Sequence, residues 1–163
     1  MHARVRTCVI SKIVVYYSVQ VKIMIVTFCG HRDIPNSEKV HTWLSRCIER
    51  LILDGATKFY LGGYGAFDFM AKSIVWDFKA KYPWIRSILV LPYPDRYVDM
   101  TFYNESIYPP LETVPRRYCI LRRNQWMVEK SDVIVACVFY SWGGAAATLK
   151  YAQRKKKHII QYQ

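Results

Sequence analysis

From residue 21 onward, short runs rich in β-branched residues alternate with longer segments in which apolar residues recur at helical spacing. This alternation is typical of βαβ units, in which a helix links two parallel strands of one sheet. We therefore expect an α/β fold of the doubly wound type, with a mostly parallel sheet of about five strands and helices on both faces. The expected strands are 22–28, 58–61, 86–91, 132–138 and 158–162; the expected helices are one that Asn36 or Ser37 caps and Gly55 closes, then 66–81, 116–130 and 145–156.

The segment 92–115 interrupts this pattern. It contains five prolines and many tyrosines but no long periodicity, so we expect an irregular loop with a short helix. The loop follows a strand at the edge of the sheet where ligands bind, which makes Tyr93 and Tyr97 candidates for stacking on a base. Ordinary packing of these tyrosines over the sheet edge is an equally good interpretation.

An apolar stretch near the N-terminus raises the question of a membrane or export segment. Lys12, Gln20 and Lys22 interrupt it, which leaves no run of about 18 apolar residues, and no small-residue cleavage site follows. We therefore expect neither a membrane span nor a signal peptide. Residues 1–20 are predicted to be an extension that folding does not need, and 21–163 to be a single domain.

The cysteine and histidine positions argue against disulfides and bound metal. The five cysteines are odd in number and widely spaced, and none forms a C-x-x-C pair, which favours a reducing, cytoplasmic compartment. The four histidines are scattered, and none lies at i, i+4 spacing from a cysteine or carboxylate suited to zinc. We expect neither a metal nor a cofactor.

Positive charge is in excess, with 24 lysines and arginines against 12 aspartates and glutamates, for a formal net charge of +12. A basic chain of this kind binds either nucleic acid or small anionic ligands. Much of the excess is peripheral, because four basic residues and no acidic one lie in 1–23 and a second basic cluster lies at 154–157. No expected helix carries a continuous basic face with interleaved aromatic residues, so a nucleic-acid partner is not favoured.

Three loops that follow an expected strand and precede an expected helix contain glycine: 30–32, 62–65 and 143–144. In a doubly wound sheet, ligands lie beyond the carboxyl ends of the strands, where these loops meet. Glycines there let backbone N–H groups approach a phosphate, and the helix N-termini add unpaired donors. Strand-to-helix turns also use glycine for positive φ, but three converging loops favour a phosphate-bearing ligand. Neither G-x-x-x-x-G-K-[ST] nor a complete G-x-G-x-x-G motif is present, which argues against ATP hydrolysis and hydride transfer.

Four polar residues near these loops each have two interpretations. Asp68, in the first turn of its helix, either stabilises the helix dipole or meets a ribose hydroxyl or a developing oxocarbenium ion. Arg123 and Asn124 either bind a phosphate and a base or sugar, or lie on a helix surface. Considered by themselves, these two residues favour the helix surface. Thr148 either bonds to the backbone of its own helix or adds a hydroxyl to an anion site.

Several segments occur in an order that points to a known family. They are 27–34 (TFCGHRDI), 59–68 (FYLGGYGAFD), 114–117 (VPRR), 123–132 (RNQWMVEKSD) and 143–146 (GGAA). These segments resemble the motifs of the SLOG superfamily, the Rossmann-like group named after the Smf/DprA and Lonely-Guy proteins. The resemblance covers about 21–162 and is closest to the small single-domain bacterial and phage branch. It implies a Rossmann-like fold.

The resemblance also implies a pocket for a nucleotide-derived molecule, such as a nucleoside monophosphate, ADP-ribose or cyclic ADP-ribose. Carried over position by position, it implies that Asp68 faces the ribose. It further implies a phosphate loop at Gly62, Gly63 and Gly65, an anion site at Gly143, Gly144 and Thr148, and pocket lining at Gly30, His31 and Arg32.

One departure from the family pattern concerns activity. Lonely-Guy enzymes release the base of a nucleoside 5′-monophosphate and carry the motif P-G-G-x-G-T-x-x-E. In this sequence Leu61 replaces the proline, Ala66 the threonine and Phe69 the glutamate, and the acid is Asp68. The resemblance therefore implies a ligand site without fixing a reaction.

Three functions follow, in order of preference. The first is a module that senses or sequesters a nucleotide-derived signal, of the kind used in bacterial immune signalling or its suppression by phages. The second is an N-glycosidase in which Asp68 stabilises the oxocarbenium-like transition state and Arg32 or Arg123 holds the phosphate. The third is a DNA-binding protein, which the charge and the DNA-processing relatives suggest. Relatives that pair through helices, and the abundance of aromatic residues, predict a homodimer.

Overall fold

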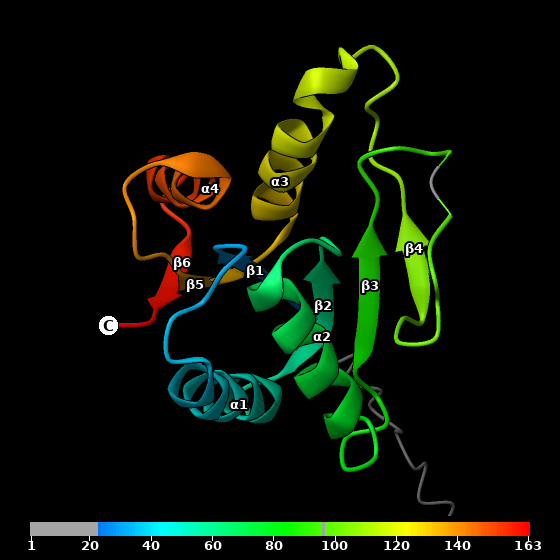
Figure 1. Cartoon of the computed structure of the whole chain (residues 1–163). Coiled ribbons are helices and arrows are strands. Elements are labelled where there is room, and N and C mark those ends of the chain that lie inside the picture. The colour runs from blue at the N-terminus through cyan, green and yellow to red at the C-terminus, as the bar shows by residue number, and fades with distance from the viewer. Residues whose placement is uncertain (1–22, 96) are drawn as a thin grey trace, which may run out of the picture.

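The computed structural model describes residues 23–95 and 97–163 (Figure 1). The predicted extension, 1–20, lies outside the described residues. The strands are β1 (Met24–Gly30), β2 (Ala56–Leu61), β3 (Arg86–Val90), β4 (Glu105–Ile107), β5 (Val133–Cys137) and β6 (His158–Gln161). The helices are α1 (Ser37–Leu53), α2 (Ala66–Phe78), α3 (Cys119–Lys130) and α4 (Gly143–Arg154), with a 3₁₀ turn, η1 (Arg116–Tyr118), before α3.

All strand pairs are parallel and form one sheet, in the spatial order β4-β3-β2-β1-β5-β6. Helices α1 and α2 pack together over one face, and α3 and α4 pack together over the other (Figure 1). The predicted α/β, doubly wound fold is therefore confirmed.

The alternation of side chains along the central strands supplies both cores. On β1, Val26 and Phe28 face the α1/α2 layer, whereas Cys29 packs on the α3/α4 side. On β5, Val135 belongs to the first core and Ile134 to the second. Burial on both faces explains why these strands are nearly continuous apolar runs in the sequence.

The strand order places a crevice next to β1. From β1 the chain proceeds through β2, β3 and β4 in one direction, and β5 then returns to pair with the other side of β1. Gly30 at the end of β1 lies beside Cys137 at the end of β5. The loops that leave these two strands diverge to opposite faces, and such a switch point is where doubly wound folds bind their ligands.

The sheet has six strands rather than about five, because the segment 92–115 contains β4. This strand has only three residues and lies at the sheet edge, where Glu105 and Ser106 are exposed. A short edge strand of this kind leaves neither an apolar alternation nor a buried run in the sequence. The expected short helix does not occur in the described residues of this segment; η1 lies after it and occupies the first three positions of the predicted helix 116–130.

Several helix ends differ from the prediction: α3 begins at Cys119 rather than at 116, and α4 ends at Arg154 rather than at 156. Helix α2 ends at Phe78, and the Phe78 carbonyl then accepts hydrogen bonds from the N–H groups of Lys81 and Tyr82, because Tyr82 precedes a proline and leaves the helix. Helix α4 begins at Gly143, two residues earlier than expected, so both glycines lie in its first turn. Within 23–95 and 97–163, no helix is long and apolar enough to cross a membrane.

Candidate functional site

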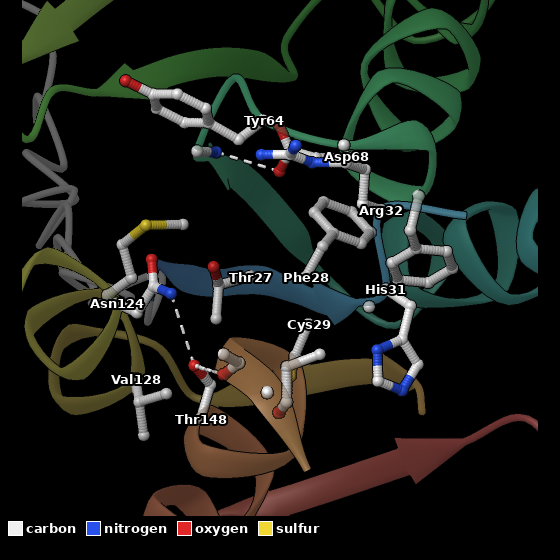
Figure 2. A pocket seen from close by; sticks show the side chains of 18 of the residues that line it. Thr27, Phe28, Cys29, His31, Arg32, Tyr64, Asp68, Asn124, Val128 and Thr148 are labelled. Carbon is white, nitrogen blue, oxygen red and sulfur yellow. Dashed lines mark hydrogen bonds between the residues drawn. The ribbon is translucent and has the colours of Figure 1, made fainter. Parts of the chain in front are cut away.

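A cavity of about 330 Å³ opens at the switch point, beyond the end of β1 and between the first turns of α2 and α4 (Figure 2). Residues from all three glycine-bearing loops line it, together with side chains of α3. Ten of the thirteen predicted binding residues line this cavity: Gly30, His31, Arg32, Gly62, Gly65, Asp68, Asn124, Gly143, Gly144 and Thr148.

The turn between β2 and α2 is held by Asp68. One carboxylate oxygen of Asp68 accepts a hydrogen bond from the Gly62 N–H at 2.9 Å, and the other accepts one from the Gly63 N–H. Burial raises the pKa of Asp68, while the hydrogen bonds from Gly62 and Gly63 and the charge of Arg123 act in the opposite direction. Asp68 therefore shapes the glycine turn, and these two N–H groups point to Asp68 rather than to a ligand.

Arg123 lies beneath this turn and does not line the cavity. Its side chain is 2% exposed, and its Nη1 donates to the carbonyls of Gly62 and Val90 at 2.6 Å each. Its Nε donates to the Asn124 side chain at 2.9 Å. Arg123 thus clamps the ends of β2 and β3, where the buried carbonyls need a donor, and it is not exposed on the helix surface.

The loop after β1 is joined to the start of α2. The Ala66 N–H donates to the Arg32 carbonyl at 2.9 Å, and a Cβ on Gly65 would lie 3.1 Å from the Arg32 Cα. Gly65 also has a φ of +85°, so both the close approach and the backbone conformation require glycine. The Arg32 side chain extends from this junction toward Asp68 and Tyr64 (Figure 2) and is exposed.

The first turn of α4 forms the opposite wall. Among the described residues, no side chain caps this helix, so its first N–H groups remain available beside the cavity. Gly143 has a φ of +86°, and a Cβ on Gly144 would meet no atom within 4 Å. Thr148 Oγ1 donates to the Gly144 carbonyl at 2.8 Å and accepts from Asn124 Nδ2 at 3.3 Å. Thr148 therefore bonds to its own helix, as one interpretation predicted, and it also lines the cavity, where a contact with an anion stays a prediction.

An aromatic cluster at the cavity mouth was missed by the sequence reasoning. The Tyr140 N–H donates to His31 Nε2 at 3.1 Å, and the Tyr140 ring lies 5.0 Å from the His31 ring and 5.4 Å from the Trp142 ring. Trp142 lines the cavity yet is 70% exposed. The signal was present in the sequence, because three aromatic residues follow a buried strand in 139–142, at the edge where ligands bind.

Two other predicted residues lie away from this cavity. The Tyr93 hydroxyl donates to the Arg116 carbonyl at 3.3 Å, and the Arg116 guanidinium lies 4.5 Å from the Tyr93 ring. Gly63 lines a separate, smaller cavity on the other side of the β2–α2 turn. No group of His, Cys, Asp or Glu side chains placed to hold a metal ion occurs within the described part of the chain.

Comparison with known proteins places this geometry in a fold family. No protein-family model and no curated protein sequence matches the chain. DNA processing protein A from Helicobacter pylori, solved to explain its single-stranded DNA binding mode, has a TM-score of 0.59 and 22% identity, over 85% of this chain and 64% of that chain. DNA processing protein A from Streptococcus pneumoniae has a TM-score of 0.62 and 15% identity, over 86% of this chain and 50% of that chain. The molybdenum cofactor carrier protein from Chlamydomonas reinhardtii has a TM-score of 0.57 and 21% identity, over 86% and 76%.

These neighbours are SLOG-type Rossmann-like proteins. This chain has the SLOG-type Rossmann-like fold. The resemblance found in the sequence is thereby confirmed at the level of the fold. The chain spans half to two thirds of the two DNA processing proteins, and at these identities the likeness concerns the fold alone.

In this SLOG-type fold the cavity is electrically suited to an anion. The N-termini of α2 and α4 both face it, and each carries a partial positive charge from its helix dipole. Arg32 adds a full positive charge at the mouth. The one carboxylate in the lining, Asp68, already accepts backbone hydrogen bonds. The net field therefore favours a negatively charged ligand near α4.

Cys29 lines the cavity, and its surroundings disfavour the reactive thiolate form. Its thiol donates to the Ala145 carbonyl at 3.1 Å, and burial raises its pKa from 9.0 to about 12. Thiolate is the reactive form of cysteine. At pH values below the pKa, a rise of about three pKa units lowers the thiolate fraction about 1,000-fold. We expect iodoacetamide at about pH 8 to alkylate Cys29 at least about 1,000-fold more slowly in the folded protein than in denaturant, as measured by site-resolved mass spectrometry. Rates that differ by less than about tenfold would contradict this assignment.

Proposed function

We propose that this cavity binds a nucleotide-derived ligand, such as a nucleoside monophosphate or ADP-ribose, and that the protein acts as a sensor or sequestering module. The observation that carries the proposal is the convergence of two helix N-termini and Arg32 on one cavity at the switch point. The same fold in a protein named as a molybdenum cofactor carrier supports a ligand-binding role. A cavity of about 330 Å³ is at the small end of ligand pockets, which suits a mononucleotide portion.

The open first turn of α4 is the best place for the phosphate. Gly143 and Gly144 have no Cβ to shield their N–H groups, and the first residues of the helix have no capping side chain among the described residues. The Thr148 hydroxyl lies one turn further along the same wall. Backbone donors of this kind bind phosphate without reading the base.

Trp142 is the best place for the base, because its exposed ring adjoins the phosphate site and is supported from behind by Tyr140 and His31. Stacking on an aromatic side chain contributes about 1–3 kcal/mol per base. We therefore expect Trp142→Ala to weaken AMP binding about tenfold in isothermal titration calorimetry, with an unchanged melting temperature.

Trp84→Ala is the matched control, because Trp84 is 58% exposed and lies before β3, outside the cavity lining. The control variant should bind AMP as the parent protein does. Equal affinities of the parent and the Trp142 variant would remove Trp142 from the site.

Base release is the second candidate function, and it is favoured by one observation: the buried carboxyl of Asp68, with a raised pKa, lies in the cavity wall. An N-glycosidase needs a carboxylate close to the anomeric carbon. Against it, both Asp68 oxygens already accept backbone hydrogen bonds. Incubating the protein with AMP and NAD and following free base by chromatography separates the two functions, since a binding module returns both nucleotides intact.

Single-stranded DNA binding is the third candidate, favoured by the neighbour solved to explain that activity and by the net charge of +12. Such binding depends steeply on salt because counterions are released from the phosphates. A gel shift with a single-stranded oligonucleotide at low and high salt tests it. An absent or salt-insensitive shift removes this candidate.

A further inference from the structure

A second cavity, of about 200 Å³, lies on the other side of the β2–α2 turn, at the ends of β2 and β3. Gly62 lines both cavities, and Gly63 lines only the second. A Cβ on Gly63 would lie 3.0 Å from Leu89 Cδ1 and 3.9 Å from the Tyr103 hydroxyl oxygen. The two cavities thus lie on either side of one glycine turn and share Gly62 in their lining.

Aromatic rings and one ammonium group form the wall of the second cavity. The Lys72 Nζ lies 5.0 Å from the centroid of the Phe69 ring and 4.6 Å from that of the Phe102 ring, so cation–π contacts hold it in place. Tyr97 also lines this cavity and is 93% exposed. None of the aromatic ring pairs in the described part of the chain includes Tyr97. The cavity therefore offers flat apolar surfaces beside a fixed positive charge.

Asp99 adds a negative charge to the same cavity. Its Oδ1 accepts hydrogen bonds from the N–H and the hydroxyl of Thr101, at 2.9 and 2.5 Å. These hydrogen bonds, with a smaller contribution from the charge of Lys72, lower the pKa of Asp99, so it is ionised at neutral pH. Oδ2 of Asp99 takes part in neither of these two hydrogen bonds, and a carboxylate oxygen of this kind can accept a hydrogen bond from a hydroxyl group.

In the second cavity the Asp99 carboxylate balances the Lys72 ammonium, whereas the main cavity adds the N-terminus of α4 to the charge of Arg32, so a phosphate suits the main cavity better. An uncharged sugar suits the second cavity well, since hydroxyls donate to Asp99 and accept from Lys72, while the C–H faces of the ring pack on aromatic side chains. We propose that the second cavity binds the terminal ribose of a two-part ligand of the ADP-ribose type, whose phosphates lie in the main cavity. This inference rests on the proposed function of the main cavity.

ADP and ADP-ribose make a direct test, because they differ by the terminal ribose. In isothermal titration calorimetry, the wild-type protein should bind ADP-ribose about tenfold more tightly than ADP. Tyr97→Ala and Lys72→Met should each abolish most of this difference while leaving the affinity for ADP within about twofold. Both side chains lie outside the main cavity, so they do not affect the phosphate site.

Tyr93→Ala is the matched control, because this tyrosine belongs to the same segment but contacts Arg116 and lines neither cavity. It should retain the full preference for ADP-ribose. Equal affinities of the wild-type protein for ADP and ADP-ribose would overturn the second site and leave the proposed function standing. An absence of binding by ADP, ADP-ribose and AMP would overturn both.

Discussion

Arg123→Met is expected to lower the free energy of unfolding by about 3–5 kcal/mol, the usual cost of leaving a buried ionic group without its partner. The change removes the donor to the carbonyls of Gly62 and Val90, which lie at the ends of two adjacent strands. It also removes the positive charge that acts on the buried carboxyl of Asp68. Denaturant unfolding followed by circular dichroism measures the loss.

Arg122→Met is the matched control, because Arg122 is the preceding residue of the same helix, is exposed, and donates to the Gln125 side chain at 3.0 Å. A surface contact of this kind contributes little, so the control should change stability by less than about 0.5 kcal/mol. Similar losses in the two variants would show that Arg123 is not the clamp described above.

Gly30→Ala should cost about 3 kcal/mol, at the upper end of what overpacking a core costs. A Cβ at this position would lie 2.4 Å from atoms of the Phe67 ring, and that ring is 1% exposed. The Phe67 ring belongs to the same core as Val26 and Phe28 of β1, so a shift of the ring disturbs core packing. The midpoint of thermal unfolding should therefore fall by many degrees, as measured by differential scanning calorimetry.

Gly144→Ala provides the contrast, because a Cβ there meets no atom within 4 Å. Its stability should stay within about 1 kcal/mol of the parent, since alanine is the better helix former. Equal stability of the Gly30→Ala and Gly144→Ala variants would contradict the close packing of Phe67 against β1.

The fold was predictable from the sequence because burial leaves a regular record. Strands such as β5 are buried on both faces and therefore form continuous apolar runs, while α1 shows the helical period and ends before Gly55, whose φ is +105°. The position of the cavity was also predictable, because the loops at the carboxyl ends of these strands contain glycine. Glycine is needed there because the backbones of neighbouring loops approach each other closely. Strand β4 left no such record because it is short and at an edge.

The roles of individual polar residues were less predictable, because they depend on tertiary contacts. Arg123 and Asn124 are adjacent in sequence, yet only Asn124 lines the cavity, whereas Arg123 turns inward to buried carbonyls. Asp68 lines the main cavity, where contact with a ribose stays a prediction, and the sequence did not show that its carboxylate holds the turn between the two cavities. Trp142 is one of three aromatic residues that follow β5, and the sequence does not indicate which of the three lines the cavity.

The most direct test of the central claim is to titrate the purified protein with AMP and to measure its melting temperature at each AMP concentration. If AMP binds the folded cavity, a concentration 100 times the dissociation constant stabilises the protein by about 2.7 kcal/mol, which raises the melting temperature by several degrees. The nucleotide should be recovered without base release. A melting temperature that stays constant with millimolar AMP, ADP-ribose and NAD alike would contradict the account of this cavity as a nucleotide site.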